Sequence, residues 1–336
     1  MALDGKILAK AKSILAERRR LKDERLGQRI SKAYDASSRI SEIDAELRAT
    51  MAHLVGVALG VDGAAGLDDI RDRNLALQQQ RRNELKQAGF PENYLDDDYL
   101  CSKCHDTGFI DSKMCDCLAD IYKDEQKASL SCLFKLGDET FDSFNLSYYD
   151  DTPAPDTGIS PRRSMEIVNK ICVEYAKNFS KGSMNLFFNG APGLGKTFLS
   201  ACIARVVADN GYSVVYDMAT TVFTKHEEVK FTRTNDSEDL RAEIKKARDD
   251  VKRYLECDLL IIDDLGTEMT TSFTISALYE IINTRLITGR KTLISSNLTL
   301  AELRRRYSEQ IMSRLEGEYQ VLTFYGEDIR KKRNVL

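Results

Sequence analysis

The residues whose types and spacing most clearly predict chemistry lie between positions 190 and 197. They read Gly-Ala-Pro-Gly-Leu-Gly-Lys-Thr, a complete Gly-x-x-x-x-Gly-Lys-Thr phosphate-binding loop, or P-loop. The glycines let backbone N–H groups point at phosphates, Lys196 brings a positive charge to the β- and γ-phosphates, and the Thr197 hydroxyl can ligate Mg²⁺. The predicted nucleoside triphosphate site consists of Gly190, Ala191, Pro192, Gly193, Leu194, Gly195, Lys196, Thr197 and Phe198.

A strand and a helix are expected to hold the P-loop. Residues 185–189 are typical of a short buried strand, and residues 198–209 are typical of a helix that ends at Asn210 and Gly211. A loop at this junction places its N–H groups at the helix N-terminus, where the helix dipole favours an anion. The alternative is a glycine-rich turn without a ligand, and the flanking strand and helix argue against it.

A second motif supplies carboxylates for a magnesium ion and for catalysis. Residues 258–264 read Asp-Leu-Leu-Ile-Ile-Asp-Asp, which is typical of a strand buried on both faces of a parallel sheet. An acid at the carboxyl end of such a strand lies where open α/β sheets bind ligands. We expect Asp263 to hold Mg²⁺, directly or through water, and Asp264 to act as the base on the attacking water. The alternative is a core strand that ends in a solvated acidic turn.

Three polar residues further along the chain complete the candidate site. Asn297 ends a predicted strand at 291–297 and could position the attacking water, or it could be an ordinary turn residue. Arg314 lies on a predicted helix at 302–316 and could reach the phosphate of a neighbouring subunit, or it could be a surface arginine. Arg330 follows a predicted last strand at 319–325 and could contact the γ-phosphate of its own subunit.

The order of these motifs resembles that of AAA+ ATPases. Within that class it is similar to bacterial replicative helicase loaders of the DnaC/DnaI type and to the related IstB-like ATPases. The resemblance covers residues 137–336 and implies an αβα sandwich with a parallel sheet that binds ATP and Mg²⁺. It also implies that Asp263 and Asp264 form the Walker B pair, that Asn297 is sensor 1, that Arg314 is the arginine finger and that Arg330 is sensor 2.

Two features depart from the common AAA+ pattern. Asp264 stands where most AAA+ proteins have a glutamate, and its shorter side chain predicts hydrolysis that is slow or depends on assembly. Six residues follow Arg330, so the helical lid of most AAA+ proteins is not expected.

Composition limits the classes of protein that remain. The 336 residues suggest two domains, or three with a helical extension. With 49 basic and 53 acidic residues the net charge is −4, which argues against a dedicated high-affinity binder of duplex DNA. The first residues lack the apolar run of a signal peptide, and no stretch approaches 18 apolar residues. We therefore expect a cytoplasmic protein with no membrane contact.

The first 58 residues have a helical pattern, with Ile40, Ile43, Leu47, Met51 and Leu54 at three- and four-residue steps. This pattern suits a helical hairpin that buries its own seam. It also suits a docking helix for a protein partner, and the family resemblance implies that this part binds the helicase. A glycine-rich break is predicted at residues 60–66, followed by a helix at 68–88.

Four cysteines, Cys101, Cys104, Cys115 and Cys117, lie within 17 residues. A Cys-x-x-Cys turn presents two thiolates to a tetrahedral Zn²⁺, and the residues between the pairs can form a hairpin that returns the second pair. Four protein ligands leave no open position, so the zinc would be structural. The Cys-x-Cys half is tighter than usual, so His105 could replace one ligand. Reduced or redox-active thiols are the alternative.

A long insert, residues 220–256, follows the predicted second strand at 212–216. It mixes basic and aromatic side chains, which can follow the phosphates of single-stranded DNA and stack on its bases. These side chains include Phe223, Lys225, His226, Lys230, Phe231 and Arg233. The insert also carries many acids, so a solvated amphipathic helix explains it nearly as well.

Taken together, the sequence predicts a helical, zinc-binding N-terminal domain at 1–136 and an AAA+ domain at 137–336. The predicted function is ATP-dependent loading of a hexameric replicative helicase onto single-stranded DNA by self-assembled AAA+ domains. An IstB-like ATPase that assists DNA transposition is the first alternative. A nucleotide-gated adaptor that barely hydrolyses ATP is the second.

Overall fold

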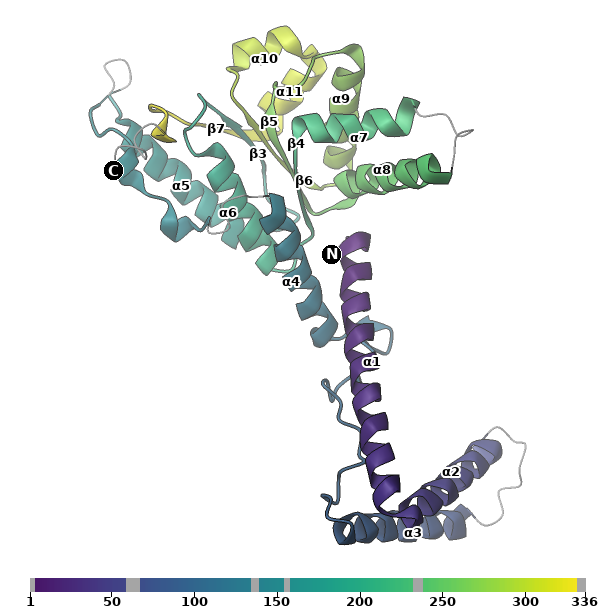
Figure 1. Ribbon diagram of the computed structural model, residues 1–336. Helices are drawn as coiled ribbons and strands as arrows, with labels where there is room; N and C mark the ends of the chain where they lie inside the picture. The colour runs from purple at the N-terminus through teal and green to yellow at the C-terminus, as the bar shows by residue number, and fades with distance from the viewer. Residues whose placement is uncertain (1–3, 59–66, 134–138, 154–157, 232–237, 331–336) are drawn as a thin grey trace. The chain divides into compact units, whose positions relative to one another are not determined.

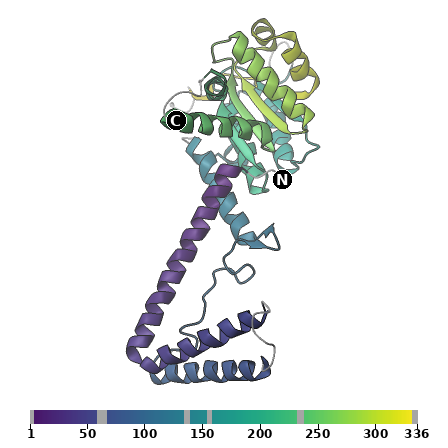
Figure 2. The ribbon, with the colours of Figure 1, turned by 90° about the vertical axis from the view of Figure 1, so that its right-hand side faces the viewer.

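The computed structural model describes residues 4–58, 67–133, 139–153, 158–231 and 238–330 (Figures 1 and 2). The glycine-rich break predicted at residues 60–66 and the side chain of Arg233 lie outside the described residues. The chain packs as two compact units. The smaller unit is Lys12–Ala119, and the larger unit combines the described residues of Met1–Ala11 with those of Asp120–Leu336. The domain boundary near residue 136 stays a prediction.

The larger unit is built on a five-stranded, wholly parallel sheet with the strand order β4-β5-β6-β3-β7. Its strands are β3 (Asn185–Asn189), β4 (Val214–Met218), β5 (Leu259–Leu265), β6 (Lys291–Ser296) and β7 (Tyr319–Thr323). Every residue of β3 is buried, as is expected for a central strand with both faces covered. The strand predicted at 212–216 lies two residues later, at β4, and β7 ends before the predicted residue 325.

Helices cover both faces of this sheet (Figure 1). One apolar core includes residues of α5 (Pro161–Lys177) and α6 (Lys196–Asp209). The opposite core includes residues of α7 (Ala219–Phe231), α8 (Glu238–Glu256), α9 (Ser272–Ile287), α10 (Leu300–Arg306) and α11 (Glu309–Gly317). The αβα sandwich with a parallel sheet, preceded by a helical region with a cysteine cluster, is therefore confirmed.

The single helix predicted at 302–316 is wrong, because the chain forms α10 and α11 with a break at Tyr307 and Ser308. Tyr307 has an extended backbone and a buried ring, and its hydroxyl donates a hydrogen bond to Glu268 in the loop after β5. Burial of this side chain ends the first helix, and Ser308 is the N-cap residue of the second.

The smaller unit has a helical part and a cysteine-bearing part. Its helices are the rest of α1 (Gly5–Ala36), α2 (Ser38–Ala58) and α3 (Leu67–Gln87), and α2 lies beside α3 (Figure 2). Ile40 and Ile43 are buried as the predicted seam requires, whereas Met51 is 55% exposed. Only part of the predicted seam is therefore buried.

The cysteine-bearing part contains the predicted hairpin, formed by β1 (Phe109–Ile110) and β2 (Lys113–Met114). The helix α4 (Asp116–Leu133) follows it. None of the described helices is long and apolar enough to cross a membrane.

Candidate functional site

The P-loop joins the carboxyl end of β3 to the first turn of α6, as predicted. Two of its glycines are required because the segment after β7 packs directly against them. A Cβ atom on Gly190 would lie 2.5 Å from the Phe324 carbonyl oxygen, and one on Gly193 would lie 1.8 Å from Asp328 Oδ1. Both glycines also have positive φ angles.

Hydrogen bonds to two of its carbonyls fix the P-loop. The Ile329 N–H donates to the Gly193 carbonyl at 3.0 Å, and the buried Tyr149 hydroxyl donates to the Leu194 carbonyl at 2.8 Å. The ring of Phe144 lies 5.8 Å from that of Phe198 and also 5.8 Å from that of Tyr149. The sequence does not predict this contact of Tyr149 with the P-loop, because a tyrosine in a polar connection carries no local signal.

Lys196 brings the loop and β6 together. Its Nζ donates to the carbonyls of Gly190 at 2.6 Å and Ala191 at 2.8 Å, and to Asn297 Oδ1 at 2.8 Å. Burial lowers the pKa of Lys196, while the charges of Asp264 and Asp263 act in the opposite direction. Three oxygens, two from P-loop carbonyls and one from Asn297, therefore position the ammonium group.

Three hydroxyls hold the Asp263 carboxylate, which is 2% exposed. The Thr197 hydroxyl donates to Oδ2 at 2.9 Å, the Tyr216 hydroxyl donates to the same oxygen at 2.6 Å, and the Ser295 hydroxyl donates to Oδ1. Burial and the Asp263 charge raise the pKa of Tyr216, which keeps its hydroxyl a donor. The contact between Thr197 and Asp263 is the one expected of two magnesium ligands.

The sequence reasoning missed Tyr216 and Ser295. A partial signal was available, because both residues are polar and lie on the strands on either side of β5, Ser295 near the carboxyl end of β6 and Tyr216 in the middle of β4. A polar residue near the carboxyl end of a flanking strand of a parallel sheet points towards the ligand edge.

Asp264 lies beside Asn297, as the sequence predicts for a base and a water-positioning residue. Asn297 Nδ2 donates to Asp264 Oδ1 at 3.1 Å, and the Asp264 N–H donates to Ser295 Oγ at 3.0 Å. Asp264 has a φ of 56°, a strained value that is concentrated at functional sites. Burial, and next the Asp263 charge, raise the pKa of Asp264.

The two candidate arginines occupy different places. Arg314 belongs to α11, and its side chain contacts α9. Its Nη2 donates to Tyr279 Oη at 3.0 Å and to Asn283 Oδ1 at 2.9 Å, and its guanidinium carbon lies 4.6 Å from the Tyr279 ring centroid. Arg330 is exposed at the P-loop side. Burial is the main cause of the lowered pKa of Lys196, and the Arg330 charge acts in the same direction.

The described residues of the insert form α7 and α8. The prediction that Phe223 and His226 stack on DNA bases is wrong. Phe223 and His226 are buried, Phe223 within the core on the α7–α9 side of the sheet and His226 against the Tyr254 ring, so neither can stack on a base. Phe231 is 60% exposed and stays a candidate. The burial pattern follows helical periodicity, as expected from the amphipathic-helix alternative for the insert.

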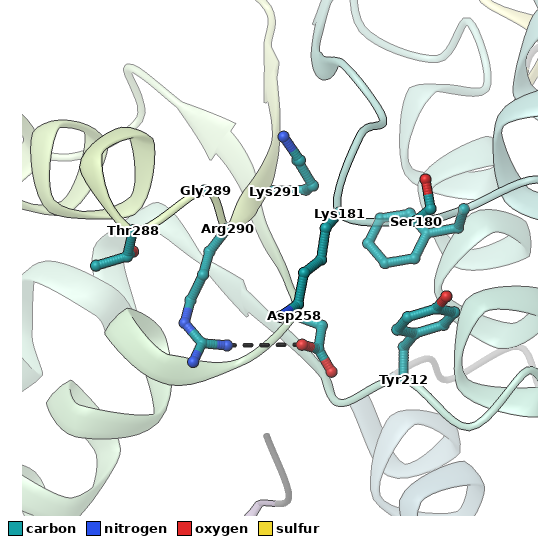
Figure 3. Close-up of a pocket in the computed structure, with 9 residues that line it drawn as sticks. Ser180, Lys181, Tyr212, Asp258, Thr288, Gly289, Arg290 and Lys291 are labelled. Carbon is teal, nitrogen blue, oxygen red and sulfur yellow. Dashed lines mark ion pairs between the residues drawn. The ribbon is translucent and has the colours of Figure 1, made fainter. Parts of the chain in front are cut away.

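A hollow of about 220 Å³ lies at the opposite, amino-terminal edge of the sheet (Figure 3). Arg290 in this hollow forms an ion pair with Asp258 at 3.6 Å, and Lys181 and Tyr212 also line it. It shares no residue with the P-loop.

The four cysteines gather in the smaller unit. Their sulfur atoms all lie within 4.8 Å of one another, with Cys101 Sγ 3.7 Å from Cys115 Sγ and Cys104 Sγ 3.4 Å from Cys117 Sγ. Zinc–sulfur bonds of about 2.3 Å in a tetrahedron place the sulfurs about 3.8 Å apart. The set therefore fits Zn²⁺. The exposed His105 ring instead packs 4.6 Å from that of Tyr99, which favours four cysteine ligands over the His105 alternative.

Backbone contacts shape the turn that carries the first cysteine pair. The Gly108 N–H donates to Cys104 Sγ at 3.3 Å, and the Cys115 N–H donates to the Gly108 carbonyl at 2.9 Å. The buried Asp106 carboxylate accepts from the N–H groups of Cys101 at 2.8 Å and Leu100 at 3.2 Å. Asp106 thus positions the turn through these two hydrogen bonds to its backbone.

The parallel sheet, the P-loop after its central strand and the acids at the end of β5 define an ATP-binding domain of the AAA+ class. The family model described as IstB-like ATP binding protein matches residues 166–335, and the chain belongs to this family.

Curated relatives support the relationship predicted from the motifs. The chain is 29% identical over 160 residues to the replicative helicase loader DnaC of Buchnera aphidicola subsp. Baizongia pistaciae. It is 22% identical over 160 residues to DnaC of Escherichia coli strain K12. The matches cover 47% and 48% of this chain and 61% of each relative. The predicted resemblance to IstB-like ATPases related to helicase loaders is confirmed.

Solved structures show similarity over a comparable part of the chain. The crystal structure of the DnaC helicase loader is 20% identical with a TM-score of 0.41, and the match covers 55% of this chain and 98% of that one. AMPPCP-bound DnaA from Aquifex aeolicus is 20% identical with a TM-score of 0.43, covering 57% and 51% of the two chains.

Proposed function

We propose that this chain hydrolyses ATP and uses the reaction to load a replicative helicase onto single-stranded DNA. The observation that carries the catalytic part is the contact network at the ligand edge of the sheet. In it Lys196 contacts Asn297, Asn297 contacts Asp264, and Thr197 contacts Asp263.

Each residue of this network has a role in the proposed reaction. The P-loop binds the phosphates, with Lys196 at the β- and γ-phosphates. Thr197 and Asp263 would hold Mg²⁺, which would neutralise charge on the phosphate oxygens. Asp264 accepts the proton of the attacking water, and Asn297 orients that water. Arg314 reaches the nucleotide of the neighbouring subunit, and Arg330 contacts the γ-phosphate of its own.

The proposed partners follow from the relatives and from the two units. Two curated relatives are named replicative helicase loaders, which supports a helicase partner. The smaller unit would bind the helicase, and zinc bound by Cys101, Cys104, Cys115 and Cys117 would hold its turn. The exposed face of α7 and α8 would contact single-stranded DNA, with Phe231 as one stacking residue.

Light scattering coupled to size exclusion tests the partner. The chain is mixed with the host's replicative helicase and ATP, and Lys196→Ala is measured in parallel. We expect a large complex whose amount depends on the nucleotide for the natural chain, and less complex for the variant. Absence of a complex with every nucleotide would reject the helicase partner.

The family match favours one second candidate, an ATPase that assists DNA transposition. Such a protein would act on duplex DNA with a transposase. Steady-state hydrolysis measured with duplex and with single-stranded DNA separates the two. Stimulation by duplex DNA alone, together with no helicase complex, would favour the transposition function.

Tyr216→Phe is expected to raise the Mg²⁺ concentration needed for half-maximal nucleotide binding about tenfold. The substitution removes a hydroxyl that orients the Asp263 carboxylate, and loss of such outer contacts typically weakens metal binding by about 10- to 100-fold. Fluorescence titration of a labelled ATP analogue against Mg²⁺ measures the shift. Tyr212→Phe, the same change in the hollow at the other edge of the sheet, is the control. An unchanged titration for Tyr216→Phe would contradict the assigned role.

As the pH falls, the rate of hydrolysis is expected to decline at pH values that lie above the range in which aspartate usually titrates. The proposed base, Asp264, must be ionised, and burial raises its pKa from the ordinary value near 3.9. The rate should therefore be lost as the pH falls through this raised pKa. Rates at saturating ATP are measured against pH, with analogue binding followed at each pH to separate catalysis from unfolding. If Asp264→Asn keeps the full rate with the same acid limb, the base is another group.

A further inference from the structure

The first turn of α1 contacts α8 within the larger unit. The Asp4 carboxylate pairs with Arg253, and Lys6 Nζ lies 2.5 Å from Asp250 Oδ1. Arg253 Nη1 also lies 3.1 Å from Asp250 Oδ1, so two acids and two bases form one network of zero net charge. We call Asp4, Lys6, Asp250 and Arg253 the α1–α8 ion network. The Tyr122 hydroxyl of α4 accepts a hydrogen bond from the Asp4 N–H at 2.9 Å.

This network is more strongly coupled than an ordinary surface ion pair. The side chains of Asp4, Asp250 and Arg253 are 2%, 12% and 22% exposed, so water screens them little. Loss of one partner would leave a buried charge uncompensated, which is strongly unfavourable. A pocket of about 460 Å³ borders the network and is lined in part by Lys252 and Glu256. Each charge of the network thus depends on its partner, and a pocket borders the network on one side.

The residue after Arg253 connects α8 to the sheet. The Tyr254 hydroxyl donates to Asp217 Oδ2 at 2.7 Å, and Asp217 follows Tyr216 on β4. Successive side chains of a strand point to opposite faces. Tyr216 accordingly packs in the α5–α6 core and holds Asp263, while Asp217 meets α8 on the other face. Adjacent residues of β4 therefore join α8 to the carboxylate proposed to bind magnesium.

We propose that the α1–α8 ion network is a latch that regulates the magnesium site. When the latch is closed, α8 is held on β4 and Tyr216 is held on Asp263, which favours binding of Mg²⁺ with the nucleotide. Opening of the latch weakens this binding. The event that opens it is binding of the helicase by residues 12–119, which continue the chain from the latch. This inference rests on the proposed nucleotide site and helicase partner.

Asp4→Asn tests the latch without removing the start of α1. Asp4 Oδ1 accepts from the Lys6 N–H at 2.9 Å and the Ile7 N–H at 3.3 Å, and asparagine caps a helix as well as aspartate does. We expect the Mg²⁺ concentration for half-maximal binding of a labelled ATP analogue to rise about fivefold. Tyr254→Phe should shift it in the same direction. The double variant should match the larger single effect, because both changes break one connection.

Lys252→Ala is the matched control, since Lys252 lines the same pocket but its side chain is 68% exposed. It should titrate like the natural chain. A natural-type titration for Asp4→Asn, or fully additive effects in the double variant, would overturn the latch. If the natural chain bound no nucleotide at any Mg²⁺ concentration, the proposed function would fail instead.

Hydrogen exchange of the unaltered chain gives a second test that needs no variant. Coupling between two sites is reciprocal, so Mg²⁺ with the ATP analogue should slow amide exchange in the first turns of α1. The expected slowing is about fivefold, equal to the shift expected for Asp4→Asn. Exchange in this segment that is identical with and without bound nucleotide would overturn the proposal.

Discussion

Lys196→Ala is expected to lower the rate of ATP hydrolysis by at least about a hundredfold. The substitution removes the only side-chain charge that the P-loop itself carries and breaks three contacts of Nζ, to two loop carbonyls and to Asn297. Loss of one preorganised electrostatic contact in an active site typically costs about 10²- to 10³-fold in rate. Steady-state release of phosphate, with and without single-stranded DNA, measures the effect.

Lys181→Ala is the control for this experiment. Lys181 is an exposed lysine of the same unit and lines the hollow at the opposite edge of the sheet (Figure 3). Its replacement should leave hydrolysis unchanged. If Lys196→Ala retained the rate of the natural chain, the P-loop would not be the hydrolytic site. If the natural chain bound ATP without measurable hydrolysis, the nucleotide-gated adaptor would be the better description.

Replacing both Cys104 and Cys115 with serine is expected to abolish zinc binding and to unfold the turn and hairpin at residues 101–117. The two buried thiols belong to opposite halves of the cluster, so their loss leaves only two sulfur ligands. Binding of a structural zinc ion contributes directly to folding free energy. Elemental analysis should give about one zinc per natural chain and about none per variant, and thermal unfolding should show the loss of a transition.

His105→Asn distinguishes between the two possible ligand sets. Asparagine tolerates the positive φ of 48° at this position, so the backbone of the turn is preserved. A site made of four cysteines keeps its zinc in this variant. Loss of zinc from His105→Asn would show that the histidine is a ligand, and a natural chain purified without zinc, and unable to bind it, would contradict the metal site.

The central features of the site could be predicted because their signals are local. The P-loop is a contiguous pattern, and β3, β5 and β6 are short apolar runs that end in polar residues. Since parallel strands all end at one edge of their sheet, these runs suffice to bring Lys196, Asp263 and Asn297 together there. The cysteine cluster was equally local, and its hairpin formed where the spacing required it.

The features that could not be predicted from the sequence depend on contacts between distant segments. Tyr149, Tyr216 and Ser295 contact residues that lie 45, 47 and 32 positions away in the sequence, so these contacts cannot be read from their immediate neighbours. The polar side chains of Tyr216 and Ser295 on the strands beside β5 gave only a partial signal. The break at Tyr307 arises because its side chain is buried against the loop after β5, which overrides the helical pattern of residues 302–316. The contact of Asp4 with Arg253 joins residues 249 positions apart.

Retention of the replicative helicase on a closed circle of single-stranded DNA tests the central claim most directly. The helicase is mixed with the circle, this chain and ATP, and the DNA-bound fraction is measured after a high-salt wash that removes loosely bound protein. The proposed function predicts salt-resistant helicase on the circle only with the natural chain and ATP, and little with Lys196→Ala. Equal retention without the chain, or no retention with it, would contradict a loader.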